Sequence, residues 1–281
     1  MLQISFFRTR KLGPDLFRKP KQFSSPAEDC ENFASSVAAT MAALKSTIVL
    51  ITGANKGIGF EIAKKLAKEQ PSYHILLGSR DPERGTASAA KLQAENLSVE
   101  AIPIDVTNDA SISAAASIVS SKFGRLDVLI NNAGVAIDHK HELGEDSLRD
   151  MMFESYNVNV FGAMQTFETF APLLEKSENP RVVFISSILG SFGEKSDMGS
   201  YPVYRSTKSA LNMLVMSFAH LYREKGWKIN ACCPGYVATD LNNFHGVGTV
   251  ESGAVNAVRL ATLRKDGETG TYSNKEGPIP W

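Results

Sequence analysis

The sequence is poor in cysteine, in charge of one sign and in long apolar runs. It has three cysteines in 281 residues, and 30 Lys plus Arg balance 30 Asp plus Glu. Three thiols cannot form a paired disulfide framework, and a chain without a basic excess is not expected to bind nucleic acid. No apolar stretch approaches the ~18 residues that cross a bilayer, so no membrane partner is expected. Two of the thiols, Cys232 and Cys233, lie in an apolar run and are expected to be buried and inert.

The first forty residues differ in composition from the rest. Up to Lys21 they carry six basic side chains and one acidic one, and a Ser/Ala-rich stretch without a sustained apolar period follows. Such a segment cannot bury a core, so we expect residues 1–44 to be a disordered, dispensable extension or a targeting segment. Its Arg-rich part loosely resembles a mitochondrial presequence, but Gly13-Pro14 and Pro20 interrupt a long helix. We therefore expect a cytoplasmic protein, with a mitochondrial location through residues 1–40 as the alternative.

From Thr47 onward, short apolar runs alternate with segments of helical period. Continuous apolar runs are typical of strands covered on both faces, and strands that alternate with helices form right-handed crossovers in a parallel sheet. Residues 45–281 are therefore predicted to form one α/β domain, a doubly wound parallel sheet of about seven strands with helices on both faces. Strands are expected at 47–52, 73–78, 99–104, 126–130, 181–186, 228–233 and 270–273, and helices at 58–68, 83–95, 110–122, 147–175, 203–224 and 250–263.

The turn between the first strand and the first helix is rich in glycine. It reads TGANKGIG from Thr52 to Gly59. Glycines there let the backbone turn tightly and approach a pyrophosphate, while free N–H groups at the helix N-terminus supply partial positive charge. A glycine cluster can also serve only a turn that needs positive φ. Its position favours a nucleotide-binding loop formed by Gly53, Asn55, Lys56, Gly57, Ile58 and Gly59.

The residues after the second strand indicate which dinucleotide would bind. An NAD enzyme carries an acid there for the ribose 2′-hydroxyl, whereas this chain has Ser79, then Arg80 and, four residues on, Arg84. Arginine grips phosphate through a planar fork, so Arg80, Arg84 and Lys56 suit the 2′-phosphate of NADP(H). Considered alone, the two arginines are better explained as solvated charges at the start of a helix, and Asp81 could serve only as a helix cap.

Two serines and a Tyr–Lys pair supply candidate catalytic groups. Ser186 and Ser187 end the fifth strand, and Tyr204 and Lys208 lie four residues apart at the start of the next helix. Residues at i and i+4 share a helix face about 5 to 6 Å apart. The ammonium is therefore expected to lower the Tyr204 pKa from its usual value of about 10, which would make the phenol a better acid–base group near neutrality.

In chain order, these motifs resemble the classical short-chain dehydrogenase/reductase family, and in detail its carbonyl-reductase-like branch. The resemblance covers about residues 45–281. It implies a Rossmann-type fold and an NADP(H)-dependent enzyme that reduces a small-molecule ketone or aldehyde to an alcohol. The further motifs that carry it are Asp105-Val106, NNAG at 131–134, Asn159, Pro234-Gly235 with Thr239, SRDPERG after the second strand and CCPGYVATDL.

The resemblance also implies a role for each matching residue. Tyr204 would be the general acid, Lys208 would lower its pKa and hold the nicotinamide ribose, Ser187 would bind the substrate oxygen, and Asn159 would anchor a water. No metal is expected. Besides the glycine loop, the residues expected to hold the cofactor are Arg80, Arg84, Asp105, Val106, Asn131, Ala133, Gly134, Tyr204, Lys208, Pro234, Gly235, Val237 and Thr239.

The sequence leaves the catalytic serine and the substrate pocket open. The family serine usually lies thirteen residues before the tyrosine, whereas Ser187 lies seventeen before Tyr204 and Ser191 has the usual spacing. We choose Ser187 because the family serine is the second of a strand-end pair. Candidates for lining an apolar substrate pocket are Ile188, Phe192, Met198, Tyr201 and Phe244.

Function and assembly also have alternatives. A catalytically silent dinucleotide-binding regulatory protein is one, although such a protein would be expected to lose Tyr204 or Lys208, and both are present. An NAD(P)-dependent alcohol dehydrogenase that works in the oxidative direction is the other. The helices at 147–175 and 203–224 leave open a homo-oligomer formed through them.

Overall fold

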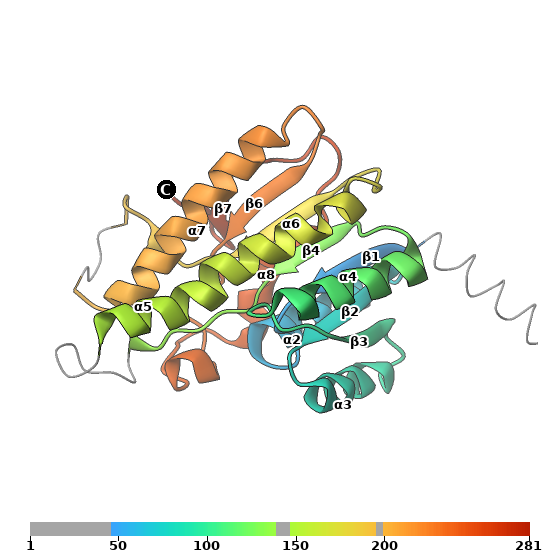
Figure 1. The fold of residues 1–281 in the computed structure, drawn as a ribbon, viewed down its shortest axis with the longest axis horizontal. Coiled ribbons are helices and arrows are strands. Elements are labelled where there is room, and N and C mark those ends of the chain that lie inside the picture. Colours follow the sequence, from blue (N-terminus) through green and yellow to red (C-terminus); the bar gives the residue numbers. More distant parts are fainter. Residues whose placement is uncertain (1–45, 139–146, 195–198) are drawn as a thin grey trace, which may run out of the picture. The chain divides into compact units, whose positions relative to one another are not determined.

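The computed structural model describes residues 46–138, 147–194 and 199–281. The predictions for residues 1–44 and for Met198 lie outside this part of the chain. A sheet lies between two layers of helices (Figure 1). Its strands are β1 (Thr47–Ile51), β2 (Tyr73–Ser79), β3 (Val99–Pro103), β4 (Val128–Asn131), β5 (Arg181–Ile185), β6 (Lys228–Cys232), β7 (Tyr272–Asn274) and β8 (Gly277–Pro278).

The strand order places a ligand site at one edge of the sheet. The order is β3-β2-β1-β4-β5-β6-β7-β8, and every pair is parallel except β7 with β8. The direction of winding reverses between β1 and β4, and open α/β sheets bind ligands beyond the carboxyl ends of the strands at this point. The doubly wound parallel sheet is confirmed. It has eight strands rather than about seven because the chain turns back after β7 into a two-residue antiparallel strand.

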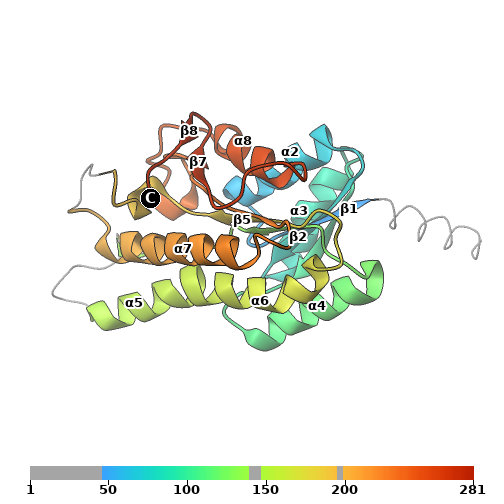
Figure 2. The same ribbon diagram turned by 90° about the horizontal axis from the view of Figure 1, so that it is seen from above.

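Each face of the sheet is covered by its own set of helices (Figure 2). One set packs on the core that contains Leu50, Phe184 and Ile229, and the other on the core that contains Val49 and Ile51. The first set is α4 (Asp109–Phe123), α6 (Ala163–Leu174) and α7 (Pro202–Leu221), and the second is α2 (Gly57–Glu69), α3 (Pro82–Gln93) and α8 (Val250–Ala261). The helix α5 (Leu148–Tyr156) extends the first layer, and its Met151 packs in a separate small cluster with Ile137 and Val203. Among the described residues, no helix has both the length and the apolar character needed to cross a bilayer.

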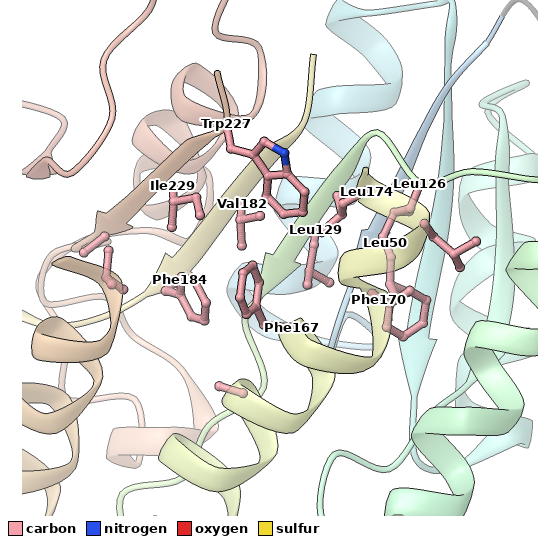
Figure 3. Packing of buried hydrophobic residues seen from close by; sticks show 14 of the residues in the cluster. Leu50, Leu126, Leu129, Phe167, Phe170, Leu174, Val182, Phe184, Trp227 and Ile229 are labelled. Carbon is pink, nitrogen blue, oxygen red and sulfur yellow. The ribbon is translucent and has the colours of Figure 1, made fainter. Parts of the chain in front are cut away.

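Aromatic side chains fill the first of these cores (Figure 3). The Phe167 ring lies 4.6 Å from that of Phe218 and 6.2 Å from that of Trp227, measured between centroids. Phe170 and Phe184 are also fully buried. Truncation of such a ring to Ala typically costs about 3–5 kcal/mol, so this core holds the helix layer that includes α7 firmly on the sheet.

The single helix expected at 147–175 is instead interrupted. A π-helical turn, η2 (Asn157–Gly162), lies between α5 and α6. A π turn inserts an extra residue and is common at functional sites. Gly162 lies in this turn, and a β-carbon there would stand 2.6 Å from the Val106 carbonyl oxygen. The interruption brings the buried side chain of Asn159 to the carboxyl edge of the sheet.

Candidate active site

The glycine loop is held by an asparagine from the neighbouring strand end. Gly53 adopts φ +62°, and Asn132 Nδ2 donates hydrogen bonds to the carbonyls of Thr52 (2.9 Å) and Gly53 (3.1 Å). A β-carbon at Gly59 would overlap Asn132 Nδ2 and lie 2.8 Å from the Gly53 carbonyl oxygen. Our residue-level predictions included Asn131 and Ala133 but missed Asn132 and Thr52, although the repeated asparagine in NNAG was a signal.

Two features of this loop and its surroundings fit a dinucleotide. The helix α2 has no side-chain cap at its N-terminus, where Lys56 is the capping residue. Its first N–H groups are therefore available for an anion. Beside the loop, the amide nitrogen and oxygen of Asn131 are buried and have no hydrogen-bond partner among the described residues. Such an orphaned group is costly unless a ligand or water satisfies it.

Of the three cations expected to bind a 2′-phosphate, one forms no ion pair with the described residues. Asp81 caps α3 by accepting a hydrogen bond from the Arg84 N–H at 3.0 Å, and its other oxygen lies 3.1 Å from Arg84 Nε. Lys56 contacts the Asp240 carboxylate. Arg80 is exposed and forms no ion pair with any described residue. Of the three predicted cations, Lys56 and Arg84 therefore already have carboxylate partners.

The remaining cofactor candidates lie at the ends of β3 and β6. After β3, Asp105 Oδ1 accepts hydrogen bonds from the Thr107 N–H (2.9 Å) and hydroxyl (2.7 Å), and Val106 is buried. Pro234 and Gly235 follow β6, with Gly235 at φ +85°. Further on, Val237 is buried, and Thr239 Cγ2 would lie 3.8 Å from a β-carbon at Gly57. The Pro234–Thr239 segment thus reaches back to the glycine loop.

The four predicted catalytic residues meet at the carboxyl ends of β4 and β5. Tyr204 is buried, and its phenol lies beside the Ser187 side chain. Lys208 Nζ donates to the Ile185 carbonyl at 2.8 Å and lies 5.5 Å from the centre of the Tyr204 ring. Gly134 lies beside this group, since a β-carbon on it would stand 3.3 Å from Asn159 Oδ1 and 3.7 Å from Lys208 Nζ.

Asn159 ties this group to the backbone that follows β4. Its Oδ1 accepts from the Val135 N–H at 2.8 Å, and its Nδ2 donates to the Val135 carbonyl at 2.8 Å. Nδ2 also donates to the Thr207 hydroxyl at 3.1 Å. Thr207 is a residue that the sequence analysis did not single out. Asn159 therefore joins η2, the segment after β4 and α7.

The pKa values of the Tyr–Lys pair depart from the expectation. Burial raises the pKa of Tyr204 well above its ordinary value, Cys233 and Asp138 add to the rise, and the Ser187 hydrogen bond opposes it. Burial lowers the pKa of Lys208 to about 8. The expected lowering of the Tyr204 pKa by Lys208 is therefore wrong for this arrangement, because burial of the phenol decides the direction of the shift. The phenol stays protonated at neutral pH.

The two candidate serines have different partners. Ser191 is buried, and its hydroxyl donates to the Pro280 carbonyl at 2.5 Å while it accepts from the N–H groups of Gly193 and Glu194, both at 3.1 Å. Ser187 instead contacts the phenol of Tyr204. The extra residues before Tyr204 thus place Ser191 against the C-terminal segment.

Side chains near the site divide into core and surface groups. Ile188 packs on the core, and Tyr201 is partly buried. Phe192 and Phe244 are 74% and 65% exposed.

Cys232 and Cys233 are both buried, as expected, and burial raises the pKa of each thiol, to about 12 for Cys232. Their reactive thiolate forms are therefore disfavoured.

Comparisons with known proteins agree with this geometry. The family model described as short chain dehydrogenase matches residues 47–246. The chain belongs to the short-chain dehydrogenase/reductase family. It is 40% identical over 246 residues to short-chain dehydrogenase/reductase ATR10 of Stachybotrys chlorohalonatus, covering 82% of this chain and 88% of that one. It is also 32% identical to a (+)-neomenthol dehydrogenase of Arabidopsis thaliana, covering 76% of this chain and 90% of that protein.

A solved structure extends the match to three dimensions. The NADPH-bound carbonyl reductase from chicken fatty liver superposes with a TM-score of 0.74 at 30% identity, covering 85% of this chain and all of that one. This chain is thus an oxidoreductase. Its family uses nicotinamide dinucleotides and acts on small molecules.

Proposed function

We propose that this short-chain dehydrogenase/reductase reduces a ketone or aldehyde to an alcohol with NADPH, and that Tyr204 donates the proton. The observation that carries the proposal is the place of the phenol, which is buried beside Ser187 with the Lys208 ammonium 5.5 Å from the centre of its ring. A proton donor must hold its proton at the working pH, and the phenol of Tyr204 does so at neutral pH.

The other residues have supporting roles in this proposal. NADPH, when bound, supplies the hydride that reaches the carbonyl carbon. Tyr204 transfers its phenolic proton to the substrate oxygen, and Ser187 holds that oxygen through its hydroxyl. Lys208 donates to the nicotinamide ribose, and the amide of Asn131, which has no partner among the described residues, hydrogen-bonds along the cofactor. Asn159 keeps the edges of the site together through its bonds to Val135 and Thr207.

The proposal is tested by following NADPH absorbance while the purified protein is mixed with a panel of ketones and aldehydes. Loss of NADPH with formation of the alcohol is expected for at least one carbonyl with an apolar or aromatic part. A protein that binds NADPH but reduces nothing would support the regulatory alternative. Faster turnover of alcohols than of carbonyls at neutral pH would support the oxidative one.

Replacement of Arg80 by Ala is expected to reduce the preference for NADPH over NADH by about tenfold. The reason is that charge-assisted contacts to a phosphate contribute about 1.5–3 kcal/mol each, and Arg80 has no competing ion pair among the described residues. The measurement is the ratio of kcat/KM with the two cofactors. Arg84→Ala should change the ratio less, because Arg84 already pairs with Asp81, and the exposed Arg223→Ala should not change it. An unchanged ratio in Arg80→Ala would contradict the prediction.

The activity is also expected to depend on pH through Lys208. Its pKa of about 8 means that the ammonium loses its charge as the pH rises through about 8. A neutral amine holds the ribose hydroxyls less well, so kcat/KM for NADPH should fall above this pH. In Lys208→Arg the guanidinium stays charged, so the remaining activity should lack this falling limb. The same limb in both proteins would assign it to another group.

Two expectations about location and assembly remain proposals. Apolar side chains are exposed on α5, η2 and α7, neighbouring helices of one layer, and they support a homo-oligomer through these helices. These side chains are Leu148, Met152, Phe153, Phe161, Met213, Met216 and Leu221. The cytoplasmic location and the dispensable role of residues 1–44 likewise remain predictions.

A further inference from the structure

The first turn of α7 is capped by a carboxylate from a distant part of the chain. The helix's own hydrogen bonds begin with the Arg205 N–H, which donates to the Tyr201 carbonyl. Pro202 has no N–H, and Tyr201, the capping residue, has φ +54° and no side-chain cap bond. This leaves the N–H groups of Val203 and Tyr204, which the helix cannot satisfy itself.

Asp138 satisfies both groups. The Val203 N–H donates to its Oδ1 at 2.8 Å, and the Tyr204 N–H donates to its Oδ2 at 3.1 Å. The two partners are separated by 65 and 66 residues along the chain. A carboxylate at a helix N-terminus also interacts favourably with the helix dipole. The bond to the Tyr204 N–H fixes the backbone of the proposed proton donor directly.

The segment that carries Asp138 is itself fixed. Asn159 binds both the N–H and the carbonyl of Val135. Two residues further on, Ile137 is buried in a small cluster with Met151 and Val203, the latter in the same turn of α7. The carboxylate is therefore presented by a segment that is held to η2 on one side and to α7 on the other.

We propose that Asp138 is a positioning residue of this enzyme. Its carboxylate fixes the first turn of α7 and thereby sets the phenol of Tyr204 against Ser187 and the substrate oxygen. The proposal rests on the proposed function for its catalytic consequence, and on the two hydrogen bonds for its geometry.

Asp138 also acts on Tyr204 through its charge. The groups that face the phenol are Lys208 on its own helix, Cys233 after β6, Tyr272 on β7 and Asp138. Asp138 contributes to the raised pKa of Tyr204, since a negative charge disfavours the tyrosinate. Asp138→Asn keeps one oxygen acceptor and removes the charge, whereas Asp138→Ala removes both.

Hydrogen–deuterium exchange tests the geometry without any substrate. The amides of Val203 and Tyr204 owe their protection to Asp138 in this structure, so peptides that cover 202–208 should exchange faster in Asp138→Ala than in the wild type. The control is Val215→Ala, which opens a cavity at a fully buried position further along α7 and destabilises the protein without touching the cap. Equal exchange of this turn in wild type and Asp138→Ala would overturn the capping role.

Kinetics test the catalytic consequence. Asp138→Ala should lower kcat by about tenfold or more, because small displacements of a reacting group are costly, whereas Val215→Ala should keep kcat at a temperature where it is folded. Asp138→Asn, which keeps one oxygen acceptor, should lower kcat less than Asp138→Ala does. Wild-type kcat in Asp138→Ala would overturn the positioning role. A wild-type protein that turns over no carbonyl would instead overturn the proposed function, while the exchange result would still report on the cap.

Discussion

Tyr204→Phe is expected to lower kcat for carbonyl reduction by about a hundredfold or more. The change removes only the hydroxyl, which donates the proton in the proposed reaction and lies beside Ser187. The ring remains to fill its buried position. Lys208 should keep its place, because its ammonium is held by the Ile185 carbonyl and not by the phenol. NADPH binding, measured by fluorescence titration, should therefore stay close to that of the wild type.

The matched control for this prediction is Tyr222→Phe. Tyr222 follows the last residue of the same helix, and its ring lies 4.3 Å from that of Trp227, measured between centroids. This variant also loses a tyrosine hydroxyl, but far from the site, so kcat should not change. If Tyr204→Phe retained more than about a tenth of the wild-type kcat, another group would have to be the acid.

Much of this fold could be predicted because each signal was local. The strands of the central sheet are continuous apolar runs, and the glycine loop and the Tyr–Lys spacing are short patterns with a physical cause. The interruption of the helix expected at 147–175 could not be predicted in this way. It arises where Gly162 approaches the Val106 carbonyl, a contact between segments more than fifty residues apart.

The electrostatics of the site were harder to predict than its residues. The spacing placed Lys208 near Tyr204 correctly, but it could not show that both groups are buried or that the ammonium bonds to the Ile185 carbonyl. Desolvation then decides the direction of both pKa shifts. Spacing gives distance along a helix, whereas burial depends on the elements that pack over it.

Asp138 was missed for a related reason, although the sequence held a trace of it. A helix that starts at Pro202 is normally preceded by Ser, Thr, Asp or Asn, and this chain has Tyr201 there. The missing local cap implied that the N–H groups of the first turn would find another partner. Only the tertiary structure shows that this partner follows β4.

Gly59→Ala is expected to weaken NADPH binding by about tenfold or more and to lower the melting temperature. The added β-carbon would stand 2.8 Å from the Gly53 carbonyl oxygen and 3.0 Å from Ala54 Cα, and it would overlap the amide of Asn132. Two of these neighbours are backbone atoms of the glycine turn, which cannot move without changing the loop. Overpacking of this kind costs about 1–3 kcal/mol.

Gly59→Ala should affect cofactor affinity most strongly, because Asn132 holds the loop through the carbonyls of Thr52 and Gly53. If the methyl group displaces Asn132, the N–H groups at the start of α2 are no longer held in the direction proposed for binding the pyrophosphate. The control is Gly199→Ala, since a β-carbon there meets none of the described residues within 4 Å, and its NADPH affinity and melting temperature should match those of the wild type. Measurement of both quantities in the two variants separates the effects. Wild-type affinity in Gly59→Ala would show that the cofactor binds without the close approach of α2 to the Gly53 turn.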